Sequence, residues 1–97
     1  MKTPPPQSID GARVIAYVVV THEHRHTGKT KHCRGGLLPP SSALAICQYE
    51  NEPSFYLFGC DEAWNCVTDT YHDTLEDAFH QAQWEYEGIS SAWIWIE

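Results

Sequence analysis

"ALAICQYENEPSFYLFGCDEAWNCVTDTYH", residues 43–72, is the stretch that decides the fold. It contains three short runs rich in aromatic and aliphatic residues, which predict strands at 43–50, 55–60 and 66–72. The connections "NEPS" and "DEAWN" are short and polar, as turns between neighbouring strands are. The stretch therefore predicts a tight antiparallel meander.

The segment that follows, "HDTLEDAFHQAQWEYEG" (72–88), has the spacing of an amphipathic helix. Asp73 is the expected N-cap, with Glu76 three residues later in a capping-box arrangement, and Gly88 is the expected terminator. At about 100° per residue, five apolar residues share a face that we expect to lie on the sheet: Leu75, Ala78, Phe79, Ala82 and Tyr86. Trp84 points about 180° away from the first of them, on the polar side.

The flanking segments complete an α+β domain. Residues 13–24 are rich in β-branched residues and predict a strand that folds back through "TKHC" (30–33) after a turn at "TGK". "RGGLLPPSS" (34–42) predicts a loop. "SAWIWIE" (91–97) predicts a last strand that pairs with the sheet, with Trp93 and Trp95 on one of its faces. We expect an antiparallel meander of four to five strands with one helix packed on one face.

The N-terminal residues 1–10 hold three consecutive prolines and predict a disordered arm, which leaves residues 11–97 as a single domain. The arm lacks the apolar run of a signal peptide. The sequence also lacks the roughly 20 consecutive apolar residues that span a bilayer. We therefore expect a soluble, cytoplasmic protein that does not bind membranes.

Charge is segregated along the chain. All six basic residues lie in the first 34 positions, whereas eleven of the thirteen acidic residues lie from Gly35 to Glu97. Nucleic-acid binding needs a basic surface, so this pattern argues against a nucleic-acid partner. It favours a basic protein partner attracted by complementary charge. The alternative is that the acidity only keeps a small protein in solution.

A histidine-rich hairpin gives a second functional hypothesis. Five residues between positions 22 and 33 are candidate metal ligands: His22, His24, His26, His32 and Cys33. The first three alternate along a predicted strand, and imidazole suits Zn or Ni. Same-face neighbours on one strand lie nearly 7 Å apart, so a site would combine two of them with a ligand from across the hairpin. The alternative is a solvent-exposed turn, and no other cofactor is expected.

The cysteines and the acidic pairs Asp61–Glu62 and Glu76–Asp77 predict no catalytic residue. The four cysteines could form two disulfides in any of three pairings. Cys47, Cys60 and Cys66 lie in apolar strand segments, however, where we expect free thiols that pack as small hydrophobic groups. Cys66 and His72 share one face of a strand but lie roughly 20 Å apart at the β-strand rise. The sequence contains no nucleophile-elbow motif. We therefore predict that the protein is not an enzyme.

Exposed aromatic residues are the other indication of a partner. Trp84 lies on the polar side of the predicted helix and Trp64 in a predicted turn, and exposed Trp tends to anchor interfaces. Together with neighbouring helix carboxylates they give the predicted partner-binding residues: Trp84, Glu85, Glu87, Asp77 and Trp64. The competing interpretation packs Trp84 under the C-terminal strand or the proline arm, with Trp93 and Trp95 in the core.

These features predict a non-enzymatic interaction module that binds a basic protein partner or self-associates as a homodimer. In the homodimer, the His-rich hairpin of one copy would lie against the helix side of the other. Small acidic immunity proteins that neutralise basic toxins are an analogous case. The alternative function is a metal-binding protein that uses the hairpin 22–33.

The stretch "FYLFGCDEAWNCVTDTYHDTLEDAFHQAQWEYEG" (55–88) resembles a pattern in small uncharacterised bacterial proteins. These carry an aromatic strand, a Cys-Asp-Glu turn, and an Asp-Thr-aromatic-His junction into an acidic helix. The resemblance covers about a third of the chain. It implies a strand–turn–strand–helix unit and a bacterial origin, with Asp69, Thr70 and His72 at the junction, and it implies no activity. From the residues alone, these three can satisfy backbone groups before the helix.

Overall fold

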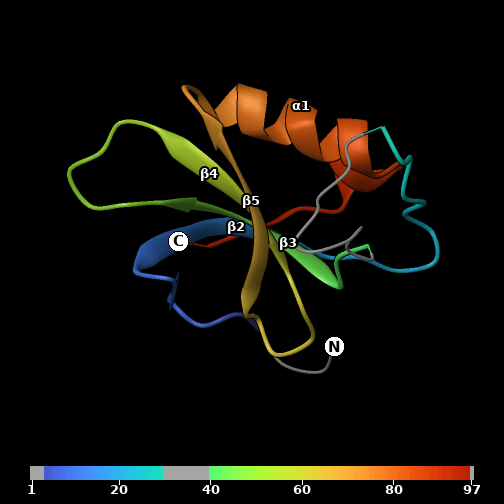
Figure 1. Ribbon diagram of the computed structural model, residues 1–97, viewed down its shortest axis with the longest axis horizontal. Helices are drawn as coiled ribbons and strands as arrows, with labels where there is room; N and C mark the ends of the chain where they lie inside the picture. The colour runs from blue at the N-terminus through green and yellow to red at the C-terminus, as the bar shows by residue number, and fades with distance from the viewer. Residues whose placement is uncertain (1–3, 30–39, 97) are drawn as a thin grey trace.

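The sheet is a curled antiparallel meander whose strands follow in chain order (Figure 1). The structure is a computed structural model and describes residues 4–29 and 40–96. Five strands lie side by side: β1 (Ser8–Ile9), β2 (Ala12–Val19), β3 (Ala43–Gln48), β4 (Phe55–Cys60) and β5 (Cys66–His72). The helix α1 (Leu75–Glu85) packs on one face, and β6 (Ile94–Trp95) pairs with β2. The predicted α+β fold is confirmed.

β1 corrects the prediction of a disordered arm over residues 1–10, because the end of that segment is a strand. Ile9 pairs with Ala12 across a two-residue turn. The turn residues Asp10 and Gly11 have φ angles of 50° and 82°, and a type I′ hairpin needs positive φ at both positions. Ile9 is buried, so the arm contributes to the core.

β2 is shorter than the strand predicted over residues 13–24. It ends at Val19, and beyond it the chain makes local hydrogen bonds. Nδ1 of His24 accepts the N–H of Thr21 at 3.2 Å, and the N–H of His24 donates to the carbonyl of Thr21 at 2.9 Å. Such side-chain bonds offer the backbone a turn in place of strand pairing. The predicted second arm, 30–33, lies outside the described residues.

The helix begins later than predicted from the 72–88 pattern. Thr74, rather than Asp73, is its N-cap, and the Thr74 hydroxyl oxygen accepts the N–H of Asp77 at 3.1 Å. The reason is strand pairing, because His72 is still the last residue of β5.

The end of the helix also differs from the prediction. Tyr86 leaves the helix in an extended conformation and forms a β-bridge with His26. Gly88, the predicted terminator, has φ of 75° and instead precedes a 3-10 helix, η1 (Ile89–Ser91). Ser91 belongs to η1, and of the predicted strand 91–97 only Ile94–Trp95 form β6, while Glu97 lies outside the described residues.

Each face of the sheet has its own hydrophobic cluster, since alternate residues of β3 point to opposite faces. Leu44 and Ile46 pack under the helix, and all five residues of the predicted helix face lie in or against this cluster. Ala45 and Cys47 belong to the cluster on the other face, which includes Trp64. The sheet is therefore buried on both sides along its centre.

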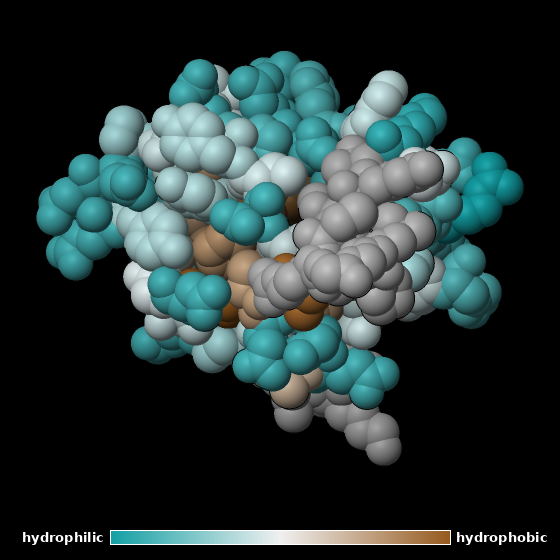
Figure 2. Space-filling model, in the orientation of Figure 1, coloured by the Kyte–Doolittle hydropathy of each residue, from teal (hydrophilic) through white to brown (hydrophobic). Residues whose placement is uncertain are grey.

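The outer surface is mostly polar. Figure 2 shows that hydrophilic residues cover much of the face drawn there, while hydrophobic residues gather over the strands. Within the described residues, no helix has both the length and the apolar character that a membrane crossing requires.

Candidate functional site

The five predicted partner-binding residues do not form one surface. Trp84 is 51% exposed, as its helical position predicts, and Asp77 and Glu87 are also exposed. Trp64 and Glu85 are buried, with 5% and 4% of their surface exposed. A buried side chain presents no surface to a partner. The expectation that these two residues lie at a partner-binding surface is therefore corrected, because both lie in the interior.

Asp61 organises the turn that carries Trp64 inward. Its Oδ1 accepts the N–H groups of Ala63 and Asn65, both at 2.9 Å. The hydrogen bonds from Asn65 hold the pKa of Asp61 below its ordinary value. Trp64 adopts a φ of 64°, and its ring meets that of Tyr17 edge to face with centroids 5.7 Å apart. A local carboxylate and a strained backbone therefore place an indole from a turn in the core.

The C-terminal end of α1 is covered by the chain's own basic loop, residues 25–29 (Figure 1). The N–H of Thr27 donates to the carbonyl of Glu85, and the N–H of Glu87 donates to the carbonyl of Arg25, both at 2.8 Å. The first bond satisfies a carbonyl that a helix end otherwise leaves unpaired. The loop is thus held to the helix by its backbone.

Side chains add to this contact. Arg25 forms an ion pair with Glu87, and the hydrogen bond between them raises the pKa of Arg25 and lowers that of Glu87. Nζ of Lys29 lies 4.5 Å from the centroid of the Trp84 ring, which is a cation–π contact. This part of the helix surface therefore holds a guanidinium and an ammonium group of the same chain.

The three predicted metal-ligating histidines that the structure describes lie in an irregular loop and do not share a strand face. His22 is exposed, His24 accepts a backbone N–H, and the ring of His26 packs against Tyr86 with centroids 5.1 Å apart. In the part of the chain that the structure describes, no three His, Cys, Asp or Glu side chains are grouped to hold a metal. The other two predicted ligands lie outside that part: His32 and Cys33.

The described cysteine side chains pack in the hydrophobic core or against it. Cys47 and Cys60 are buried, and burial raises the pKa of both, that of Cys60 to about 12. The thiolate is the nucleophilic form, so neither is reactive near neutral pH. Cys66 and His72 are the first and last residues of β5 and do not meet. Nε2 of His72 lies instead 2.7 Å from the hydroxyl oxygen of Thr70.

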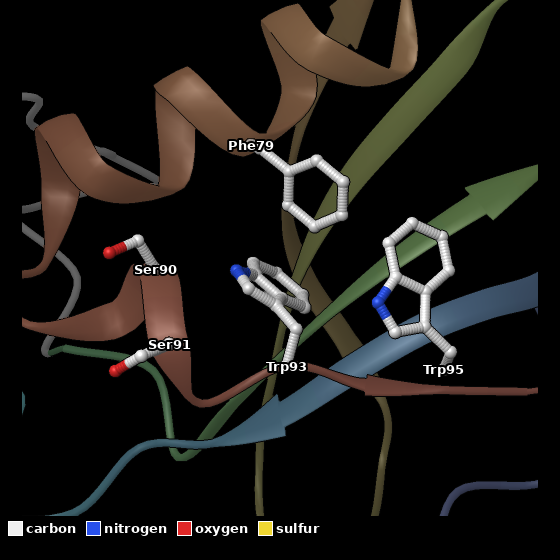
Figure 3. Close-up of a pocket in the computed structure, with 5 residues that line it drawn as sticks. All are labelled: Phe79, Ser90, Ser91, Trp93 and Trp95. Atoms are coloured by element: carbon white, nitrogen blue, oxygen red, sulfur yellow. The ribbon is translucent and has the colours of Figure 1, made fainter.

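An open pocket of about 350 Å³ lies between α1 and the C-terminal segment (Figure 3). We call it the aromatic pocket, and its lining residues are Phe79, Ser90, Ser91, Trp93 and Trp95. The Phe79 ring points from the helix toward the two indoles, with centroids 5.0 Å from Trp93 and 5.4 Å from Trp95. Nε1 of Trp93 is buried, and no described group accepts its proton. The pocket therefore has apolar walls and two serine residues, and an indole N–H unpaired among the described residues lies buried behind its surface.

Sequence reasoning found only part of this pocket. The alternation of the last segment placed Trp93 and Trp95 on one face, and their shared contact with Phe79 agrees. The wall formed by Ser90 and Ser91 was missed, because it depends on the 3-10 turn of η1. The signal available for that turn was the glycine at position 88, which was interpreted as a helix end only.

Exposed large apolar residues gather beside the aromatic pocket. Ile94, Trp95 and Ile96 are consecutive and expose 50%, 55% and 38% of their surface. The other large apolar residues exposed in the described ranges lie elsewhere, Trp84 on the helix and Tyr71 on β5. We call residues 94–96 together with the aromatic pocket the C-terminal site.

Comparisons with protein families, with curated proteins and with solved structures find no match for this chain. Its function is therefore argued from the geometry of its own residues.

Proposed function

We propose that this protein is a non-enzymatic interaction module that binds a basic protein partner at the C-terminal site. The proposal is carried by one observation, the run of exposed apolar residues 94–96 beside an open aromatic pocket. Exposed large apolar side chains concentrated at one sheet edge of a small domain are typical of an interaction site. Tryptophan side chains also contribute strongly to protein–protein affinity.

The charge of the surrounding chain supports a basic partner. Residues 40–96 include ten acidic residues and no Lys or Arg. Such a surface attracts a partner of opposite charge and disfavours partners of the same sign. The contacts of Arg25 with Glu87 and of Lys29 with Trp84 are examples of the pairs that a basic partner can form.

The test is a selection of a phage-displayed random peptide library against the immobilised protein, at about 50 mM and about 500 mM NaCl because salt screens charge attraction. We expect the enriched peptides to combine net positive charge with apolar residues, and the enrichment to fall at high salt. Light scattering in parallel reports whether a second copy occupies the site.

Two variants locate the binding surface. Trp95→Ala should lose the enriched peptides. Tyr71→Ala removes an aromatic ring of similar exposure from β5, at the opposite edge of the sheet from β6, and should retain them. Enrichment of peptides without positive charge, or equal loss of binding in both variants, would contradict the proposal.

A further inference from the structure

Among the described strands, only β2 pairs with the backbone of β6. Its register with β2 places Trp95 opposite Ala16, and the N–H of Ile96 donates to the carbonyl of Ile15 at 2.8 Å. Antiparallel hydrogen bonds involve alternate residues. Ile94 and Ile96 therefore bond to β2, whereas the N–H and C=O of Trp95 point away from it. Within residues 4–29 and 40–96, β6 pairs with no other strand.

The side chains of β6 alternate with the same period. Trp95 lies on the helix side, at the aromatic pocket, so Ile94 and Ile96 project from the opposite face. All three are substantially exposed. A strand laid along this edge would therefore cover apolar surface on both faces of the sheet, and its residue opposite Trp95 would lie over the pocket.

The aromatic pocket also offers a hydrogen-bond donor. In Figure 3 the indole nitrogen of Trp93 is on the side of the ring toward Ser90, and it is buried without an acceptor among the described residues. A buried donor without an acceptor is unfavourable. A ligand that shifts the indole enough to expose this N–H could pair it with a carbonyl or hydroxyl oxygen, which a polypeptide carries and a purely apolar ligand lacks.

We infer that β6 binds an extended basic segment of the protein partner as an added strand. The segment forms backbone hydrogen bonds with Trp95 and places an apolar side chain in the aromatic pocket. The choice of a basic occupant rests on the proposed function, and the net charge of the chain supports it: a second copy would bring a net charge of −7 to a protein with the same net charge. Strand addition at an open edge is a recurrent mode of peptide recognition, in which the backbone supplies affinity and the pockets supply specificity.

The test uses two peptides with the same side chains. The parent is acetyl-Lys-Val-Lys-Leu-Lys-Val-Lys-amide. The analogue is methylated on the backbone nitrogen of Leu and of both Val residues. The residue that bonds to Trp95 is directly opposite it and shares its face, so it is an apolar residue of the peptide. N-methylation removes the donor of that residue. Titration into the full chain, followed by calorimetry, should give a Kd at least about tenfold weaker for the analogue.

The outcomes separate this inference from the proposed function. Equal affinity of the two peptides would refute strand addition and leave a basic-partner module intact. If neither peptide binds, the result counts against both strand addition and the proposed basic-partner function. A version of the parent with Glu in place of Lys should not bind, and its binding would refute the choice of a basic occupant.

Two variants of the protein complete the test. Trp95→Ala should weaken binding of the parent peptide by about tenfold, whereas Trp84→Ala removes an equally exposed indole outside the C-terminal site and should change nothing. Circular dichroism checks that both variants fold. A dimer of the free protein that the parent peptide does not dissociate would show that a second copy is the occupant, and would overturn the inference.

Discussion

Replacing Gly59 by alanine should destabilise the fold, because two hydroxyl groups occupy the space that a Cβ atom needs. A Cβ at this position would lie 2.3 Å from Oγ1 of Thr68 and 2.4 Å from Oγ of Ser41. Gly59 belongs to β4, which is paired with β3 on one side and β5 on the other. The backbone therefore has little freedom to move away. Overpacking of this kind costs about 1–3 kcal/mol, and each kcal/mol lowers the Tm of a domain of this size by roughly 4–8 °C.

Urea unfolding followed by tryptophan fluorescence measures this cost. The matched background carries Ser41→Ala and Thr68→Ala, which remove both hydroxyl groups. The Cβ of Ser41 is already at an ordinary contact distance of 3.5 Å, so Gly59→Ala should cost less than about 0.5 kcal/mol there, as at an uncrowded site. The reasoning is refuted if Gly59→Ala is neutral in the wild type, or if its cost is the same in both backgrounds.

Three further predictions follow from the caps and the buried groups. Thr74→Ala should lower the free energy of unfolding by about 1 kcal/mol in thermal unfolding, because the N–H of Asp77 loses its acceptor. Thr74→Ser keeps a hydroxyl acceptor and should retain most of that stability. Burial lowers the pKa of His72, so the unfolded chain binds the proton more readily and stability should fall as the pH drops through about 6.5. His72→Asn should flatten that dependence in urea titrations at about pH 7.5 and about pH 5.5, and an equal slope in both proteins would contradict it. Mass-mapped alkylation at neutral pH should leave Cys47 and Cys60 unmodified until the protein unfolds, since burial raises the pKa of both; modification under native conditions would be the contrary result.

The central meander and the helix face were predictable because their signals are local. Strands 55–60 and 66–72 have the predicted bounds, and the third, predicted over 43–50, ends at Gln48. The β1 hairpin was not predicted, although Asp10-Gly11 is a strong type I′ turn signal. The reason is that the three prolines before it favour a prediction of disorder for the whole segment 1–10.

The partner site was less predictable because it depends on long-range contacts. Helical spacing placed Trp84 outside, as observed. Glu85 follows Ala78 by seven residues and therefore lies within about 20° of it on the helix, so spacing already indicated that Glu85 is buried. Spacing could not show that Trp64 turns inward at a positive φ fixed by Asp61. A polar turn predicts that its tryptophan is exposed, and only the backbone conformation shows that this side chain points inward.

The docked basic loop decides which surface is left for a partner. The predicted homodimer placed the His-rich hairpin of one copy against the helix side of another, but in this structure Arg25 and Lys29 make those contacts within one chain. An intramolecular contact acts at a high effective concentration. A partner that pairs with Glu87 or stacks on the Trp84 ring therefore competes with the loop. Within residues 4–29 and 40–96, a partner displaces no strand from the outer edge of β6, and this difference favours the C-terminal site as the first point of contact.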